Sequence, residues 1–80
     1  MVFVEIVFVG LPIDRDEVEE ALEAAFELDG EVTGAGSGMG RCHLDLEVAE
    51  SLDAAVALER LQRVLSELGV AGCATTNVSE

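Results

Sequence analysis

The sequence contains no lysine, tryptophan or tyrosine, and its four basic residues are all arginine. Against them stand 17 Asp and Glu residues, which give a formal net charge of −13. Because nucleic-acid binding depends on Lys and Arg to neutralise phosphates, this charge argues against a nucleic-acid partner, and it disfavours an anionic membrane for the same reason. A basic protein would be attracted instead. Solubility or life in high salt would explain the same acidic surface, and charge alone does not separate these interpretations.

Long apolar runs are also missing. No run approaches the ~18 residues of a membrane-spanning helix. The first nine residues lack a basic segment and contain Glu5, so we expect no signal peptide. Two cysteines, Cys42 and Cys73, are too few for a disulfide framework and indicate thiols in a reducing compartment. We therefore expect a cytoplasmic protein. Its 80 residues, half of them hydrophobic, predict one domain spanning residues 1–80.

Four segments have the composition of strands. Residues 2–9 are β-branched or aromatic apart from Glu5, and residues 41–48 alternate with a period of two. Shorter strands are expected at residues 31–33 and 70–78.

Two helices are expected between these strands. The first would begin at an Asp14 N-cap, with Glu17 completing a variant of the capping box, and Gly30 would close it. The second would begin at a Ser51 N-cap and end at Gly69. The faces expected to be buried are Val18, Ala21, Leu22, Ala25 and Phe26 in the first helix and Ala54, Ala57, Leu58, Leu61, Val64, Leu65 and Leu68 in the second.

The order βαββαβ predicts an α+β, ferredoxin-like fold. Such a fold has a four-stranded antiparallel sheet with the first and third strands in the middle and two helices on one face. The name refers to shape only, since no iron–sulfur ligand pattern is present.

One sheet face is then left open, and side-chain alternation predicts its residues. Cys42, Leu44, Leu46 and Val48 are apolar and should face the helices, so their neighbours face outward. Clustered exposed apolar side chains usually mark an interface, although a loop or the C-terminal tail could cover them. The predicted partner-binding residues are Phe3, Glu5, Val7, Val9, Arg41, His43, Asp45 and Glu47.

The glycine-rich segment 34–40, GAGSGMG, should join the middle strands as a wide hairpin loop or a bulge. It matches no phosphate-binding pattern, because it has no Lys and a strand rather than a helix follows it. Backbone amides beside Arg41 leave an anion-binding loop as an alternative. The residues expected to contact a partner from this loop are Gly36, Ser37, Gly38 and Met39.

We expect no catalytic residue, no metal site and no cofactor. His43 with Glu5 and Asp45 could bind a divalent metal or supply a base, but one His with two carboxylates is a weak ligand set. Cys42 and His43 are adjacent on a strand and point to opposite faces, which argues against a Cys–His nucleophilic pair.

The segment GEVTGAGSGMGRCHLDLEV, residues 30–48, resembles a hairpin of small, uncharacterised bacterial ferredoxin-like proteins. Some of these proteins are similar to immunity proteins or antitoxins that accompany secreted toxins. The resemblance extends over the hairpin and the helix after it, and it transfers no catalytic residue. It implies a protein-binding role.

Three functions compete on these observations. The first is an acidic module that covers a basic partner surface, such as a nuclease cleft, using the sheet or Asp16, Glu19, Glu20, Glu23 and Glu27 of the first helix. The second is a regulatory or structural homodimer that buries its open sheet face, with or without a small-ligand site. The third is an enzyme that uses His43, which we do not favour.

Overall fold

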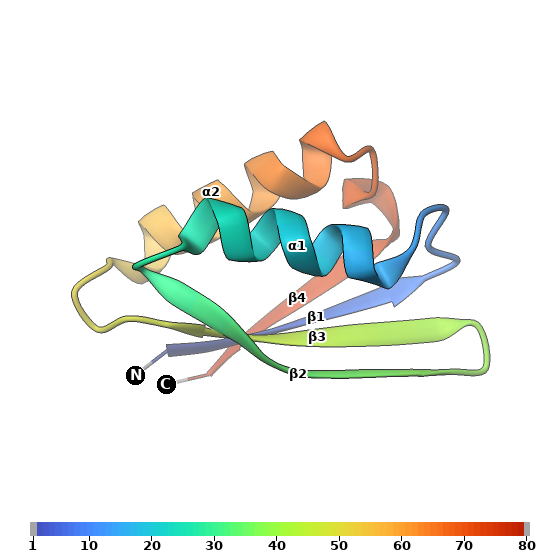
Figure 1. The fold of residues 1–80 in the computed structure, drawn as a ribbon, viewed down its shortest axis with the longest axis horizontal. Coiled ribbons are helices and arrows are strands. Elements are labelled where there is room, and N and C mark those ends of the chain that lie inside the picture. Colours follow the sequence, from blue (N-terminus) through green and yellow to red (C-terminus); the bar gives the residue numbers. More distant parts are fainter. Residues whose placement is uncertain (1, 80) are drawn as a thin grey trace.

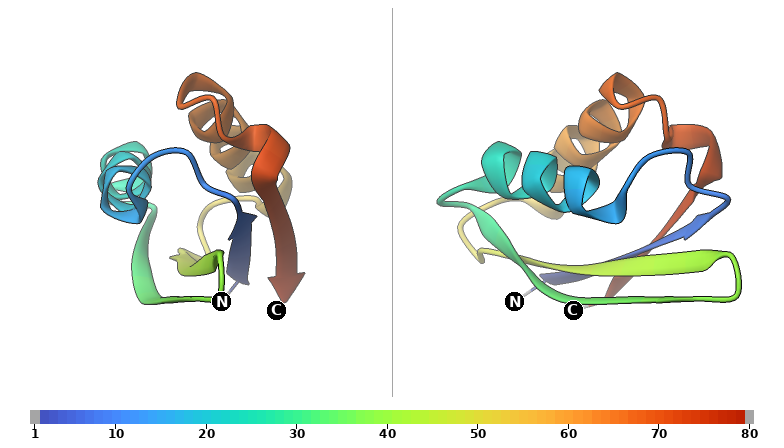
Figure 2. Two further views of the ribbon diagram at one scale, coloured as in Figure 1. Left: turned by 90° about the vertical axis from the view of Figure 1, so that its right-hand side faces the viewer. Right: turned by 45° about the vertical axis from the view of Figure 1, so that its right-hand side comes forward.

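The computed structural model describes residues 2–79. Four strands form one antiparallel sheet in the order β2-β3-β1-β4, so the first and third strands are central as predicted. Both helices lie on the same face of this sheet, and the other face is bare (Figures 1 and 2). The chain therefore has the predicted ferredoxin-like α+β fold. The elements are β1 (Val2–Val9), α1 (Arg15–Phe26), β2 (Gly30–Gly38), β3 (Arg41–Val48), α2 (Ala54–Glu67), a 3₁₀ turn (Ala71–Cys73) and β4 (Ala74–Ser79).

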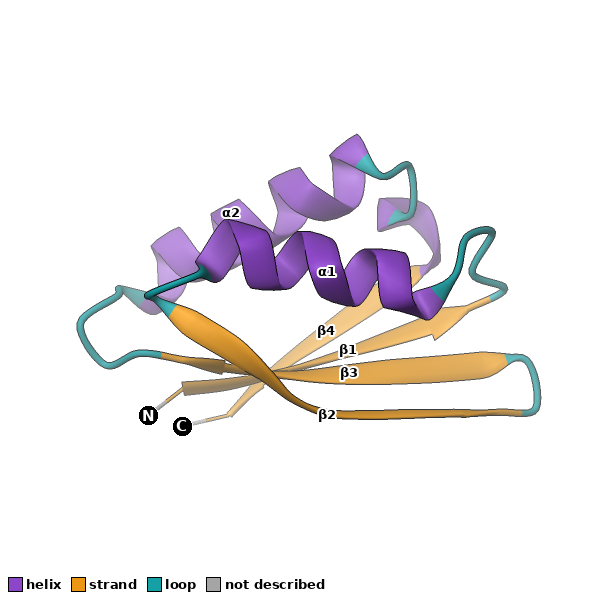
Figure 3. Cartoon of the chain, viewed as in Figure 1, coloured by secondary structure: helices purple, strands orange, loops and turns teal. Residues whose placement is uncertain are grey.

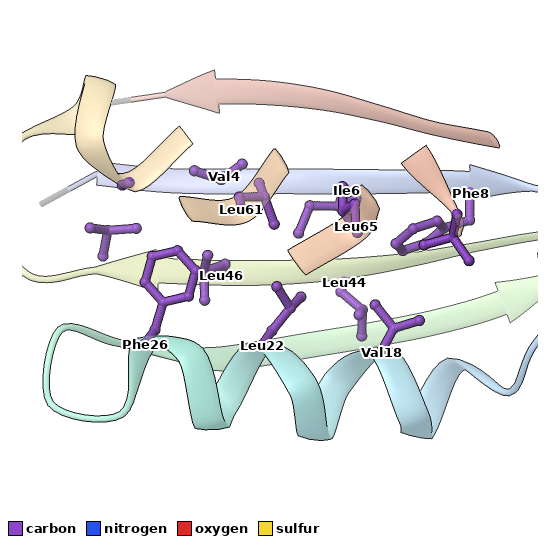
Figure 4. Close-up of a cluster of buried hydrophobic side chains, with 13 residues drawn as sticks. Val4, Ile6, Phe8, Val18, Leu22, Phe26, Leu44, Leu46, Leu61 and Leu65 are labelled. Carbon is purple, nitrogen blue, oxygen red and sulfur yellow. The ribbon is translucent and has the colours of Figure 1, made fainter. Parts of the chain in front are cut away.

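A single hydrophobic core lies between the helices and the sheet. Every second residue of the central strands points into it, and α1 contributes Val18, Leu22 and Phe26, which face Leu44 and Leu46 in Figure 4. Burial of these side chains supplies the main force for folding. The buried residues are Val4, Ile6, Phe8, Val18, Leu22, Phe26, Leu44, Leu46, Val48, Ala57, Leu61, Leu65 and Val70.

Arg60 fastens α2 to the end of α1. Its Nη1 donates to the Ala25 carbonyl oxygen at 3.2 Å and to the Asp29 Oδ2 at 2.8 Å. Its guanidinium also lies 5.2 Å from the centroid of the Phe26 ring. The α1 carbonyl that Arg60 satisfies is one of those that a helix end leaves without an intrahelical partner.

The predicted helix ends need correction. The first helix stops at Phe26, where Glu27 adopts a φ of 28°, and Gly30 is already the first residue of β2 rather than a helix cap. Asp14 holds the N-cap position, but its side chain makes no capping hydrogen bond. The second helix is capped by Asp53, not Ser51, because the Asp53 carboxylate accepts from the Ala55 amide at 2.8 Å.

Two predicted strands also need correction. The last strand begins at Ala74, since Val70 is buried in the core and a 3₁₀ turn follows it. The glycine-rich segment is not a wide loop. Most of it belongs to β2, and only Met39 and Gly40 form the turn of the hairpin. The glycine-rich segment forms a strand because its backbone groups pair with those of β3, although its composition alone favours a loop.

Figure 3 shows that loops are confined to the short connections between elements. Within residues 2–79, no helix is long and apolar enough to cross a membrane.

Candidate functional site

The open sheet face, meaning the face opposite the helices, carries all eight predicted partner-binding residues. Of the β3 residues predicted to face the helices, Leu44, Leu46 and Val48 are buried. Side-chain alternation therefore predicted the two faces of β3 correctly. Phe3 and Val9 keep 41% and 56% of their surface exposed. No described helix or loop lies over this face of the sheet (Figure 2). Across the two central strands, the opposed pairs are Phe3–Glu47, Glu5–Asp45, Val7–His43 and Val9–Arg41.

Glycines on β2 form a groove floor beside β3. Gly34 lies opposite Asp45, and Gly36 lies opposite His43. A Cβ at Gly34 would be 2.7 Å from the Asp45 Oδ2, and one at Gly36 would be 2.5 Å from the His43 Cε1. The imidazole and the carboxylate therefore lean across β2 into space that any other residue would fill. The His43 Nε2 lies 3.8 Å from the Asp45 Oδ2, and both side chains are 42% exposed.

Two pairs of carboxylates oppose each other on this face. Glu5 lies across from Asp45, and Glu31 lies across from Glu47. Directly opposed residues of neighbouring strands bring their Cβ atoms to roughly 5 Å, where like charges repel. Among residues 2–79, Glu5, Glu31 and Glu47 form no ion pair with any arginine. The fold thus holds four acidic groups close together, and among residues 2–79 His43 lies beside one of them, Asp45.

Two shallow depressions flank Glu5 on the open sheet face. The first has a volume of about 380 Å³ and lies beside Val7, His43 and Arg41 over the β2 glycines. The second, of about 370 Å³, lies between Phe3 and the carboxylates of Glu5 and Asp45. Its remaining walls are polar and come from Thr33, Asn77 and Ser79, with Val4 and Val78 completing it.

The sequence reasoning missed the outer strands of this face. Glu31 belongs to it, as do Thr75, Asn77 and Ser79, which pair with β1. Once β4 is known to be an edge strand of the sheet, side-chain alternation along it predicts which of its residues lie on the open sheet face. The predicted loop contacts are divided: Gly36 and Gly38 lie on the open sheet face, Ser37 lies on the helix side, and Met39 is in the turn.

His43 is not part of a group of metal ligands among the described residues. Within residues 2–79, no group of three or more His, Cys, Asp and Glu side chains is arranged to hold a metal ion. Cys42 and Cys73 are both free thiols on the half-buried margin of the core.

Comparison with known proteins supports the fold and leaves the function open. No family model matches the chain, and no curated protein matches its sequence. One similar solved structure is the crystal structure of a formyltetrahydrofolate deformylase from Pseudomonas putida KT2440. The alignment has a TM-score of 0.63 and 12% identity, and it covers 100% of this chain but 29% of that chain. The chain thus spans less than a third of the deformylase, and the likeness is one of fold. None of these comparisons supports the resemblance to toxin immunity proteins.

Proposed function

We propose that this chain is a small acidic protein-binding module that holds a basic protein partner on its open sheet face. The observation that carries the proposal is the two pairs of opposed carboxylates, Glu5 with Asp45 and Glu31 with Glu47. Like charges at directly opposed strand positions disfavour the free protein, more for Glu31 with Glu47 than for Glu5 with Asp45, because the Asp45 carboxylate leans over Gly34 and away from β1. Lys or Arg side chains of a partner would neutralise them, and the net charge of −13 would steer such a partner toward the chain.

The depression between Phe3, Glu5 and Asp45 is suited to a basic side chain. A guanidinium there would meet two carboxylates and could stack on the Phe3 ring, which is the combination that arginine favours at interfaces. Phe3 and Val9 would add apolar contact around this point.

A more specific form of this function is an immunity- or antitoxin-like inhibitor. Such a protein would cover the basic cleft of a toxin by mimicking its polyanionic substrate. The outer side of α1 is a second acidic surface, with Asp16, Glu19, Glu20, Glu23 and Glu27 along it. An experiment must therefore separate the sheet from the helix. Residence in the cytoplasm and the absence of catalytic activity stay predictions.

A homodimer that packs two open sheet faces together is the second candidate function. The exposure of Phe3 and Val9 beside half-buried Val7 favours it. Four carboxylates on each copy oppose it, because burying them against their equivalents would cost several kcal/mol for each unpaired charge. Light scattering at low and high salt decides between the candidates. A monomer at both salt concentrations leaves the face free, whereas a dimer at both favours self-association.

The binding test is an NMR titration of the ¹⁵N-labelled chain with an octa-arginine peptide as the basic probe. Amide shifts should concentrate at Phe3, Glu5 and Asp45. The double variant E5Q/D45N should weaken binding at least tenfold. E19Q/E23Q removes the same charge from α1 and should weaken it much less. Equal losses in the two variants, or shifts spread evenly over α1, would refute a site on the sheet.

A further inference from the structure

A further depression lies at one end of the sheet, and it shares Arg41 with the open sheet face. The segment after β1 and the tip of the β2–β3 hairpin meet there, as both views in Figure 2 show. A hydrogen bond from the Gly10 amide to the Gly40 carbonyl oxygen, 3.2 Å long, joins the two. This pocket is a shallow, open depression with a volume of about 430 Å³.

The pocket is lined by the two arginines that form no ion pair with any described residue. Arg60 is paired with Asp29 at 2.8 Å, and Arg63 with Glu59 at 3.7 Å. Within residues 2–79, Arg15 and Arg41 form no ion pair, and both line this pocket. Unpaired cations are unexpected in a chain with 17 acidic residues. Both arginines therefore lie at one depression, where an external anion can pair with them.

Arg15 is also incompletely satisfied. Its Nη1 donates to the Ser37 Oγ at 2.5 Å, which holds the start of α1 against β2. Its Nε is shielded from solvent and has no hydrogen-bond partner among residues 2–79. A guanidinium has five donors in a planar fork that fits a carboxylate, and a shielded donor left unpaired is unfavourable. The Arg15 guanidinium thus has donor capacity that no group among residues 2–79 uses.

The remaining walls restrict the kind of anion. Asp14 also lines the pocket. Arg15, Arg41 and Asp14 together give the lining a formal charge of +1, from two positive groups and one negative. This charge suits a single carboxylate better than a dianionic phosphate. Leu11 and Ile13 pack partly on the core beside it, and the Met39 side chain at the hairpin tip is fully exposed. These side chains provide an adaptable apolar wall.

We propose that this pocket binds a small organic monocarboxylate. Arg15 holds the carboxylate, Arg41 adds positive potential at the rim, and Leu11, Ile13 and Met39 contact the apolar body of the ligand. The site is separate from the depression around Phe3 and Glu5, so either one can exist without the other.

The test is an NMR titration of the full chain with isovalerate, isovaleramide and inorganic phosphate as probes. Isovalerate should cause saturable amide shifts at Gly10, Gly38 and Gly40 with a dissociation constant on the order of 1–10 mM, as expected for a few contacting atoms. Isovaleramide has the same shape without the charge and should cause none. A preference for phosphate, or no saturable shift with isovalerate, would overturn the proposal.

Variants make the test specific. R15Q should weaken isovalerate binding at least tenfold, and R41Q should weaken it severalfold. R63Q removes an equal charge from α2 and should leave the dissociation constant unchanged. Because R15Q also removes the contact to Ser37, D14N provides a second measurement: asparagine keeps the N-cap preference while removing a negative charge, so binding should tighten. Weaker binding in D14N, or equal effects in R41Q and R63Q, would contradict a site at this pocket.

Discussion

Gly30 lies opposite Val48 at the start of β2, and a Cβ at Gly30 would lie 2.7 Å from the backbone carbonyl oxygen of Glu47. A backbone atom of a paired strand cannot move aside as a side chain can. We expect Gly30→Ala to lower the free energy of unfolding by about 1–3 kcal/mol, the usual cost of overpacking. Urea denaturation followed by circular dichroism measures this.

Gly38 is the matched control on the same strand. A Cβ there would have no atom within 4 Å, and its φ is not in the left-handed region. Gly38→Ala should leave stability unchanged or raise it by up to about 0.5 kcal/mol, because alanine loses less backbone entropy than glycine. Equal losses at the two positions would show that the Glu47 carbonyl is not the cause.

The hairpin turn holds Met39 in an unfavourable conformation. Met39 has a φ of 51° and Gly40 one of 77°, the combination of a two-residue type I′ turn, for which Asn-Gly is preferred. The Met39 side chain is fully exposed, so replacing it removes no packing. Met39→Asn should raise the free energy of unfolding by about 0.5–1 kcal/mol, and Met39→Val should lower it. Thermal melts of both variants check the two signs, and a lower melting temperature for Met39→Asn would contradict this turn type.

The cap of α2 gives a paired prediction. The Asp53 side chain accepts from the Ala55 amide, so Asp53→Ala should cost about 1 kcal/mol. Ser51 is exposed and lies two residues before the cap, so Ser51→Ala should change stability by less than about 0.5 kcal/mol. Chemical denaturation of both variants decides which residue caps the helix, and the reverse order would restore Ser51 as the cap.

Arg60 should matter more than Arg63, although both are on α2. Arg60→Gln removes the ion pair with Asp29, the hydrogen bond to Ala25 and the contact with Phe26, and we expect a loss of about 1–2 kcal/mol. Arg63 pairs with Glu59 at 3.7 Å where both side chains are largely exposed, so Arg63→Gln should cost less than about 0.5 kcal/mol. Similar losses in urea denaturation would mean that the α1–α2 contact contributes little.

The opposed carboxylates predict a stabilising substitution. Glu31→Gln removes the repulsion between Glu31 and Glu47 and should raise stability by about 0.2–1 kcal/mol at low salt. About 1 M NaCl reduces the Debye length to roughly 3 Å, so the gain should shrink there. Thermal melts at both salt concentrations measure it, and a loss at low salt would show that Glu31 has a favourable role in the free protein.

The order of elements and the burial pattern were predictable because they depend on local periodicity. Residues 41–48 alternate cleanly, and the structure buries Leu44, Leu46 and Val48 as expected. The stripe of α1 is likewise buried at Val18, Leu22 and Phe26. These patterns repeat over two or more turns or several strand residues, so single exceptions do not obscure them.

The errors fall where composition and tertiary structure disagree. Glycine content predicted a loop at residues 34–40, but β3 pairs with this segment as far as Gly38. The glycines are tolerated in a strand because the His43 and Asp45 side chains fill the space above Gly36 and Gly34. Gly30 was assigned to the end of a helix for the same reason: glycine marks several kinds of backbone site, and the sequence does not say which.

The sequence by itself determined the fold class, the core and the face of each central strand, because period-two and helical patterns are local. Only the tertiary structure decided which charges meet. An extra residue, Thr33, sits in β2 between the Val32–Leu46 and Gly34–Asp45 pairs and shifts the register. This bulge places Gly34 and Gly36 on the open sheet face and turns Ser37 to the helix side, where Arg15 reaches it from 22 residues away in the chain. Register fixes such contacts, and a shift of one residue exchanges the two faces of a strand.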